Sequence, residues 1–144
     1  MVRVDFHILS SSDAHTRLIY ACRLTDKARA RNHRVYLRVA DEALASELDA
    51  LLWTFRDRSF VPHAIDAPGA ADEAVLIGTG DAPSRGEPDL LVNLAPDPVA
   101  APERFRRIVE VGDDDQAVRQ AARNRFRWYR ERGIEPEHRT VDVS

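Results

Sequence analysis

The sequence comprises 144 residues, of which 44% are hydrophobic and 31% charged, and its formal net charge is −3. A chain of this length is expected to form one domain, residues 1–144, that buries about 70% of the surface of the unfolded chain. No apolar run approaches the ~18 residues that a membrane span needs, and Asp5 and His7 stand where a signal peptide would be apolar. We therefore expect a cytoplasmic protein whose overall charge does not favour DNA.

The first half of the chain alternates between strand and helix signals. Residues 2–9 alternate apolar and polar side chains, which predicts a strand, and residues 10–13 then offer several helix-capping side chains. Apolar residues at helical spacing predict a helix over residues 14–31, then a strand over 34–39 and a second helix over 41–52.

The second half continues the pattern after a looser stretch. A short extended piece is expected at residues 60–65, and compact apolar runs predict strands over 74–78, 89–94 and 107–111. A last helix is predicted from Asp114 to Gly133, because glycine is typical of the residue that ends a helix. Strands that alternate with helices indicate an α/β fold with a largely parallel sheet.

Catalytic signals are weak throughout the chain. The turn after the first strand contains no glycine, although a dinucleotide site needs glycines there for close approach of the backbone. The Gly78-Thr79-Gly80 turn is only a weak phosphate-binding signal, and Cys22 is the single cysteine. The histidines are His7, His15, His33, His63 and His138. None of them has a second histidine at the spacing that metal ligands use. We therefore expect no catalytic residue, no cofactor and no metal.

The last predicted helix gathers positive charge in a mildly acidic chain. Five arginines and three aromatic residues lie within residues 123–132. At about 100° per residue, four arginines and one ring share roughly a quarter turn: Arg119, Arg123, Phe126, Arg127 and Arg130. Trp128 and Tyr129 fall on the far side and should pack on the sheet, where Arg125 would have to snorkel or pair.

A charged helix face is usually only solvated, but such faces normally interleave acids and bases. The arginine sector carries no acid, so its side chains repel one another, which favours an anionic partner. Single-stranded nucleic acid would use arginines on phosphates and rings under bases. An acidic peptide with a free carboxylate would use bidentate arginine contacts and a ring-lined pocket. The net negative charge and the short patch favour the peptide.

A second unusual surface is predicted around residues 51–63. Trp53, Phe55 and Phe60 surround a polar bend that ends at Pro62. These rings can belong to the core, or they can form an exposed apolar patch for a protein partner. The residue pattern leaves both interpretations open.

Several segments together resemble the chi subunit of the bacterial DNA polymerase III holoenzyme. They lie in the order of that family over nearly the whole chain: Asp41–Ala43, Leu52–Trp53, Ser59–His63, Asp89–Leu94 and Arg119–Arg130. The most specific stretch runs from Trp53 to His63. The resemblance implies a single-domain Rossmann-like three-layer fold with a mostly parallel sheet and helices on both faces. It also implies a non-catalytic accessory subunit in DNA replication or repair, associated with the clamp loader.

The resemblance implies two protein partners as well. The acidic C-terminal tail of single-stranded-DNA-binding protein would bind Arg119, Arg123, Phe126, Arg127 and Arg130, with Arg123 on the terminal carboxylate. The psi subunit, or a competing helicase, would bind Trp53, Phe60, Val61 and Pro62. DNA would be met mainly through the coating protein, and a monomer or a 1:1 heterodimer is expected.

Two departures and two alternatives accompany this interpretation. Phe126 stands where a tyrosine can occur in the family, so a hydroxyl contact would be missing, and the bend after Trp53 varies. The alternatives are a nucleotide-binding α/β enzyme that uses the crevice at the carboxyl ends of the strands, and a direct binder of single-stranded DNA.

Overall fold

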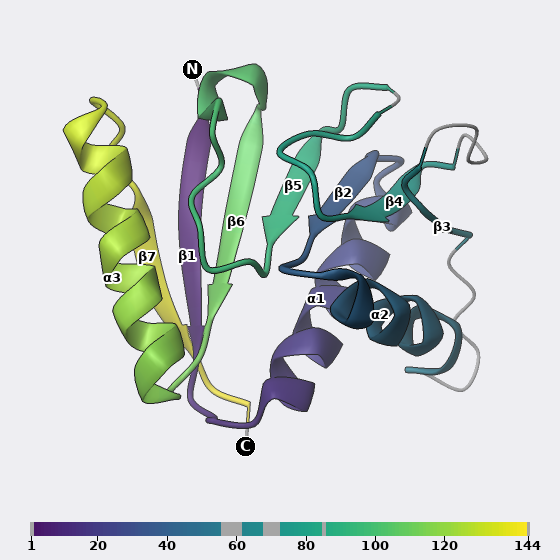
Figure 1. Ribbon diagram of the computed structural model, residues 1–144, viewed down its shortest axis with the longest axis horizontal. Coiled ribbons are helices and arrows are strands. Elements are labelled where there is room, and N and C mark those ends of the chain that lie inside the picture. Colours follow the sequence, from purple (N-terminus) through teal and green to yellow (C-terminus); the bar gives the residue numbers. More distant parts are fainter. Residues whose placement is uncertain (1, 56–61, 68–72, 85, 144) are drawn as a thin grey trace.

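A computed structural model describes residues 2–55, 62–67, 73–84 and 86–143. Its helices cover a single sheet (Figure 1): α1 (Ala14–Ala30), α2 (Glu42–Thr54), a short 3₁₀ helix (Pro102–Arg104) and α3 (Gln116–Glu131). The sheet contains these strands: β1 (Arg3–Leu9), β2 (Val35–Arg38), β3 (Ala64–Ile65), β4 (Val75–Gly78), β5 (Leu90–Asn93), β6 (Arg107–Gly112) and β7 (Glu137–Val141).

The strands lie side by side in the order β3-β4-β2-β5-β6-β1-β7, and every pair among the described residues is parallel. This arrangement confirms the predicted Rossmann-like α/β class. Parallel neighbours require crossover connections, and α1, α2 and α3 each provide one. In Figure 1, α3 lies at the β7 end of the sheet, whereas α1 and α2 lie toward the β2–β4 half.

Acidic side chains begin all three α-helices. The carboxylates of Asp13, Asp41 and Asp115 each accept a hydrogen bond from a backbone N–H in the first turn of the helix that follows. These bonds satisfy donors that have no partner inside the helix. At the other end of α3, Gly133 has φ +79°, and this left-handed conformation favours glycine. The predicted start and end of this helix are therefore confirmed to within two residues.

Two apolar clusters cover the two faces of the sheet. Alternate residues of the strands, such as Leu37 and Val109, pack with Leu48 of α2 and with α1. The intervening residues, such as Phe6 and Ile108, pack on the opposite face beneath α3. This period of two places helices on both faces, as the family resemblance implied.

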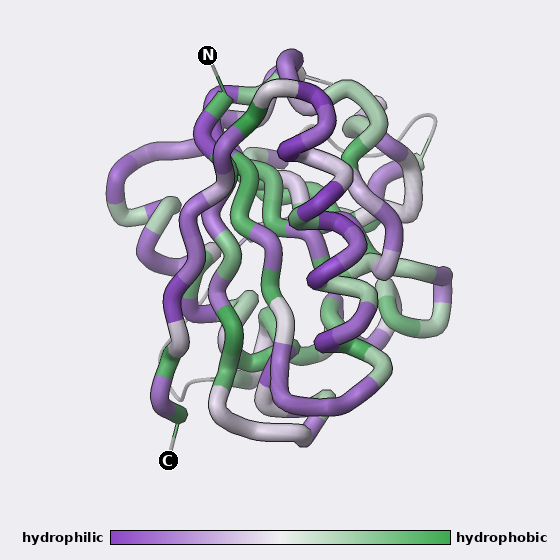
Figure 2. Tube along the Cα trace, turned by 90° about the vertical axis from the view of Figure 1, so that its left-hand side faces the viewer, coloured by the Kyte–Doolittle hydropathy of each residue, from purple (hydrophilic) through white to green (hydrophobic). Residues whose placement is uncertain are grey.

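Strand β7 is the main element that the sequence did not predict. Its residues, Glu137 to Val141, are almost all exposed, and it forms an edge of the sheet. Charged edge strands are common because they discourage pairing with other chains, but they show no apolar alternation. Figure 2, viewed from this edge, shows hydrophilic colours along β7 and α3.

Two further features concern the single cysteine and the length of the helices. Cys22 is buried, and burial raises the pKa of its thiol to about 12, which is consistent with packing rather than reactivity. Among the helices in the described part of the chain, none is long and apolar enough to cross a membrane.

Candidate functional site

The buried side of α3 is fixed to the sheet by one carboxylate. Glu110 of β6 is fully buried, and it accepts hydrogen bonds from Arg125 Nε at 2.8 Å and from the Tyr129 hydroxyl at 2.6 Å. Burial and the neighbouring carboxylate raise the pKa of Tyr129 above its ordinary value. Arg125 was expected either to snorkel or to pair, and the structure shows that it pairs. The pair holds α3 in one rotational position on the sheet.

Trp128 and Tyr129 lie on the predicted side of the helix, but to different depths. Tyr129 is completely buried, whereas Trp128 is half-buried and meets Tyr129 edge-on at 5.2 Å between ring centroids. The guanidinium of Arg132 covers the Trp128 ring at 3.6 Å from its centroid. This geometry is a close cation–π contact.

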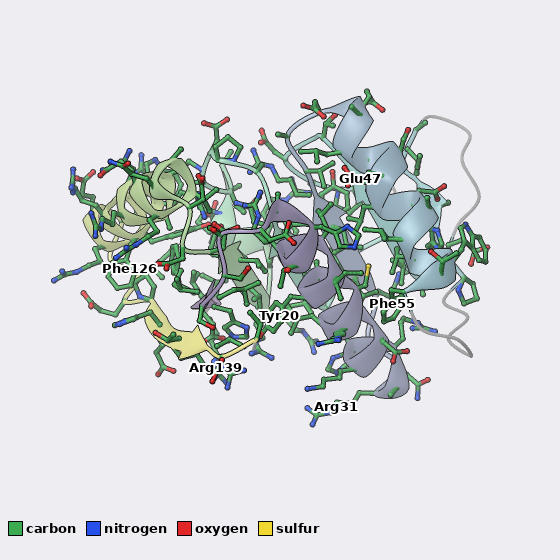
Figure 3. All side chains as sticks on the ribbon, turned by 90° about the horizontal axis from the view of Figure 1, so that it is seen from below. Tyr20, Arg31, Glu47, Phe55, Phe126 and Arg139 are labelled. Atoms are coloured by element: carbon green, nitrogen blue, oxygen red, sulfur yellow. The ribbon has the colours of Figure 1, made fainter. Side chains whose placement is uncertain are left out.

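The opposite side of α3 carries the predicted sector. Arg119, Arg123, Arg127 and Arg130 are all exposed, and Figure 3 shows blue guanidinium nitrogens gathered around the outer side of this helix. Phe126 differs from the expectation of an outward ring, because it is half-buried between α3 and β7. Its ring packs 5.3 Å from Phe6 and 6.1 Å from His138, measured between centroids.

Phe126 separates two hollows that share Arg123 as a lining residue. The strand-side cavity, between α3 and the strands, has a volume of about 410 Å³ and is lined by Phe6, Ile8, Arg119, Ala122, Arg123, Phe126, His138 and Thr140. The helix-end cavity has a volume of about 480 Å³ and is lined by Arg123, Phe126, Arg127, Arg130, Glu131 and Glu135. An apolar recess and a basic surface therefore meet at Arg123.

The electrostatic environment differs along the arginine sector. Arg119 Nη1 lies 3.4 Å from Asp114 Oδ1, and Arg130 Nε lies 3.6 Å from Glu135 Oε1. For Arg123 and Arg127, no ion pair within 4.0 Å involves another described residue. Among the described residues, the two central cations of the sector therefore have no carboxylate of the same chain as a close partner.

Five lining residues of the strand-side cavity were not among the predicted site residues: Ala122 of α3 and four residues of the strands. Phe6 and Ile8 come from β1, and His138 and Thr140 come from β7. The alternation of β1 placed Phe6 and Ile8 on one face, but it did not say that α3 would lie over that face. His138 and Thr140 could not be found, because β7 was not predicted.

The second predicted surface is partly described. Trp53 is 42% exposed, so it does not belong to the core, and Pro62 further along the chain is exposed as well. The Trp53 ring packs 4.4 Å from the ring of His63, whose Nε2 lies 3.0 Å from Asp49 Oδ1. Phe55 is half-buried against the α1 and α2 core. Phe60 and Val61 lie outside the described residues.

Polar side chains occupy the carboxyl ends of the central strands, where open α/β sheets bind ligands. Arg38 Nη1 donates to Asn93 Oδ1 at 3.1 Å, and Asn93 Nδ2 donates to Glu110 Oε1 at 2.8 Å. All three residues are buried, so they bind one another at the place where the alternative interpretation requires a nucleotide. Within the described ranges, no group of three potential ligands is placed to hold a metal ion.

The pair Asp5 and His7 of β1 also has local partners. Asp5 accepts hydrogen bonds from Arg3 and Arg107, and His7 Nδ1 lies 2.7 Å from the Tyr20 hydroxyl. Burial, together with the nearby Arg139, lowers the pKa of His7 to about 4. This histidine is therefore neutral at pH 7 and has a structural environment.

Comparison with known proteins gave consistent matches. The family model described as "DNA polymerase III chi subunit, HolC" matches residues 1–137. A DNA polymerase III subunit chi of Pseudomonas aeruginosa is 44% identical over 133 residues, which cover 92% of each chain. The Escherichia coli subunit chi is 30% identical over 102 residues, covering 70% of this chain and 69% of the relative.

One solved structure shares the fold at low identity. It is described as "The crystal structure of T4 UvsW", and it superposes with a TM-score of 0.69 at 7% identity. The match covers 99% of this chain and 42% of the other, and it concerns the fold alone.

Proposed function

Because this chain belongs to the DNA polymerase III chi-subunit family, we propose that it is a non-catalytic cytoplasmic adaptor that binds the C-terminal tail of single-stranded-DNA-binding protein. The observation that carries the proposal is the position of Arg123. Its guanidinium has no acidic partner among the described residues and lines both cavities beside Phe126. An acidic peptide that ends in an apolar residue with a free carboxylate matches this combination of charge and recess.

In the proposed complex, each chemical feature of the tail has a counterpart. The terminal carboxylate would be bound by Arg123 through charge-assisted hydrogen bonds, which favour arginine because of its planar fork. The last apolar side chain would enter the strand-side cavity against Phe6, Ala122 and Phe126. Its volume of about 410 Å³ lies within the range of ligand pockets. Preceding acidic residues would then follow Arg127 toward the end of α3.

Calorimetric titration with a synthetic tail peptide tests this proposal. We expect Arg123→Ala to weaken binding by roughly 10- to 100-fold, because hydrogen bonds between charged groups contribute about 1.5–3 kcal/mol. Arg104→Ala is the matched control, since Arg104 is also exposed but lies in the 3₁₀ helix. A peptide amidated at its C-terminus should bind the wild-type protein as weakly as the free acid binds the variant. Equal affinities of wild type and Arg123→Ala would rule out this site.

We also propose that Trp53 and Pro62, with Phe60 and Val61, bind a second protein, either psi or a helicase. The exposed Trp53 ring supports this assignment, because large exposed rings are typical of interface centres. Trp53→Ala should abolish co-purification with psi or with the helicase and leave the affinity for the tail peptide unchanged. Loss of both activities would show that the substitution disturbs the fold instead.

The same titrations distinguish the remaining alternatives. A direct single-stranded-DNA binder would bind an oligonucleotide in the absence of other proteins, with an affinity that falls steeply with salt. A nucleotide-dependent enzyme would bind a nucleotide saturably. We expect neither ligand to compete with the tail peptide at the arginine sector of α3.

A further inference from the structure

Glu135 lies outside α3 but reaches one of its arginines. The residue follows the helix by four positions, and its carboxylate lies 3.6 Å from Arg130 Nε. Both side chains are exposed, so neither is buried by the contact. Arg130 of the arginine sector is thus already paired with an acid from the same chain.

The turn at Gly133 explains why Glu135 returns to the helix. The N–H of Gly133 donates to the Arg130 carbonyl at 3.0 Å, and the N–H of Ile134 donates to the Tyr129 carbonyl at 3.1 Å. This pair of bonds with a left-handed glycine reverses the chain direction at the helix end. Ile134 then packs against the α3-side core, which fixes the start of the segment that carries Glu135.

Glu135 also lines the helix-end cavity, together with Arg123, Arg127 and Arg130. A carboxylate from an acidic peptide would therefore approach Arg130 at a position that Glu135 already faces. Two like charges near one cation repel each other, so both carboxylates bind less well together than either does alone.

From this geometry we propose that Glu135 acts as an internal competitor for Arg130, which an acidic tail residue must displace. The inference rests on the function proposed above and adds a determinant of specificity. Arg123 and Arg127 bind any tail with a free carboxylate, whereas Arg130 becomes available only to a tail with an acid placed to replace Glu135. Tails with fewer acidic residues would leave the contact between Glu135 and Arg130 in place.

Glu131 provides a matched control for this proposal. It lines the same cavity and is exposed, yet it forms no ion pair within 4.0 Å with another described residue. The substitutions Glu135→Gln and Glu131→Gln change the net charge equally. Only Glu135→Gln releases Arg130, so a difference between the two variants reports on the contact and not on overall charge.

Calorimetry with the acidic tail peptide tests the inference in a double-mutant cycle with Arg130. We expect Glu135→Gln to tighten binding by roughly two- to fivefold, which is the range for an exposed ion pair. Glu131→Gln should have a smaller effect. In an Arg130→Ala background, the gain from Glu135→Gln should disappear, because the released cation is absent.

Two results would overturn the inference while the proposed function stands. One is unchanged affinity of Glu135→Gln for a peptide that binds the wild type. The other is an equal gain from Glu131→Gln that persists in the Arg130→Ala background, because net charge alone would then explain it. Absence of any peptide binding by the wild-type protein would instead overturn the proposed function, and this inference with it.

Discussion

Arg125 and its neighbours Arg123 and Arg127 have the same side chain and lie two residues apart on α3, yet their environments are opposite. Arg125 is 3% exposed and bound to Glu110, whereas Arg123 and Arg127 are exposed and line the cavities. Two residues correspond to about 200° around a helix, which is enough to move a side chain from the sheet to the solvent. Position around the helix axis, and not residue type, therefore separates the anchoring arginine from the two exposed arginines for which binding is proposed.

The buried arginine that anchors α3 needs a carboxylate of the same chain as its partner. The exposed arginines for which binding is proposed must have no such partner. A charge taken out of water is costly unless it is paired and hydrogen-bonded, and β6 supplies that partner with Glu110. A binding arginine, in contrast, keeps its affinity for an external carboxylate only where the protein offers none of its own. Arg130, with Glu135 beside it, lies between these two cases.

The largest expected effect comes from removing the carboxylate that anchors α3 to the sheet. Glu110→Ala leaves the buried guanidinium of Arg125 and the hydroxyl of Tyr129 without their acceptor, so we expect a loss of about 3–5 kcal/mol in unfolding free energy. Urea denaturation measures this loss. A loss below 1 kcal/mol would show that Arg125 finds another partner, such as the Pro96 carbonyl that it already contacts at 3.1 Å.

A smaller effect concerns alkaline pH. Because the pKa of Tyr129 is raised in the folded state above its ordinary value of 10, folding retains a proton that the unfolded chain releases. Its contribution is complete below pH 10 and is lost as the pH rises above 10. We expect Tyr129→Phe to reduce the fall in unfolding free energy between pH 9 and pH 11. Parallel curves for the two proteins would show that other groups, such as Tyr36, dominate.

The smallest expected effect lies on the exposed side of α3. Arg127→Ala should change the unfolding free energy by no more than about 0.5 kcal/mol, as is usual for exposed side chains outside specific contacts. Removing one of several like charges relieves repulsion, so a slight stabilisation is the expected sign. Thermal and urea unfolding measure it. Destabilisation comparable to that of Glu110→Ala would abolish the distinction between the two sides of α3.

The sequence alone predicted most of the fold and the orientation of most side chains on α3. Apolar periodicity located all three α-helices and most strands, and the helical projection placed Arg123 outward and Arg125 inward. It could not identify Glu110 as the partner, since that residue is distant in sequence and lies on another element. It also missed Asp114 and Glu135 as neighbours of the arginine sector. Both residues lie outside α3 in the structure, although the predicted helix began at Asp114, so a helical projection could not place them beside Arg119 and Arg130.

The strand-side cavity depends on β7, whose five residues carry no apolar pattern. Phe6 and His138 are paired in register across β1 and β7, so the wall of the strand-side cavity joins residues 132 positions apart in the chain. During synthesis, which proceeds from the N-terminus, α3 and its arginines emerge from the ribosome before this wall exists. The recess beside Phe126 can therefore be completed only after Thr140 has been added, so it forms later than the arginine sector that it adjoins.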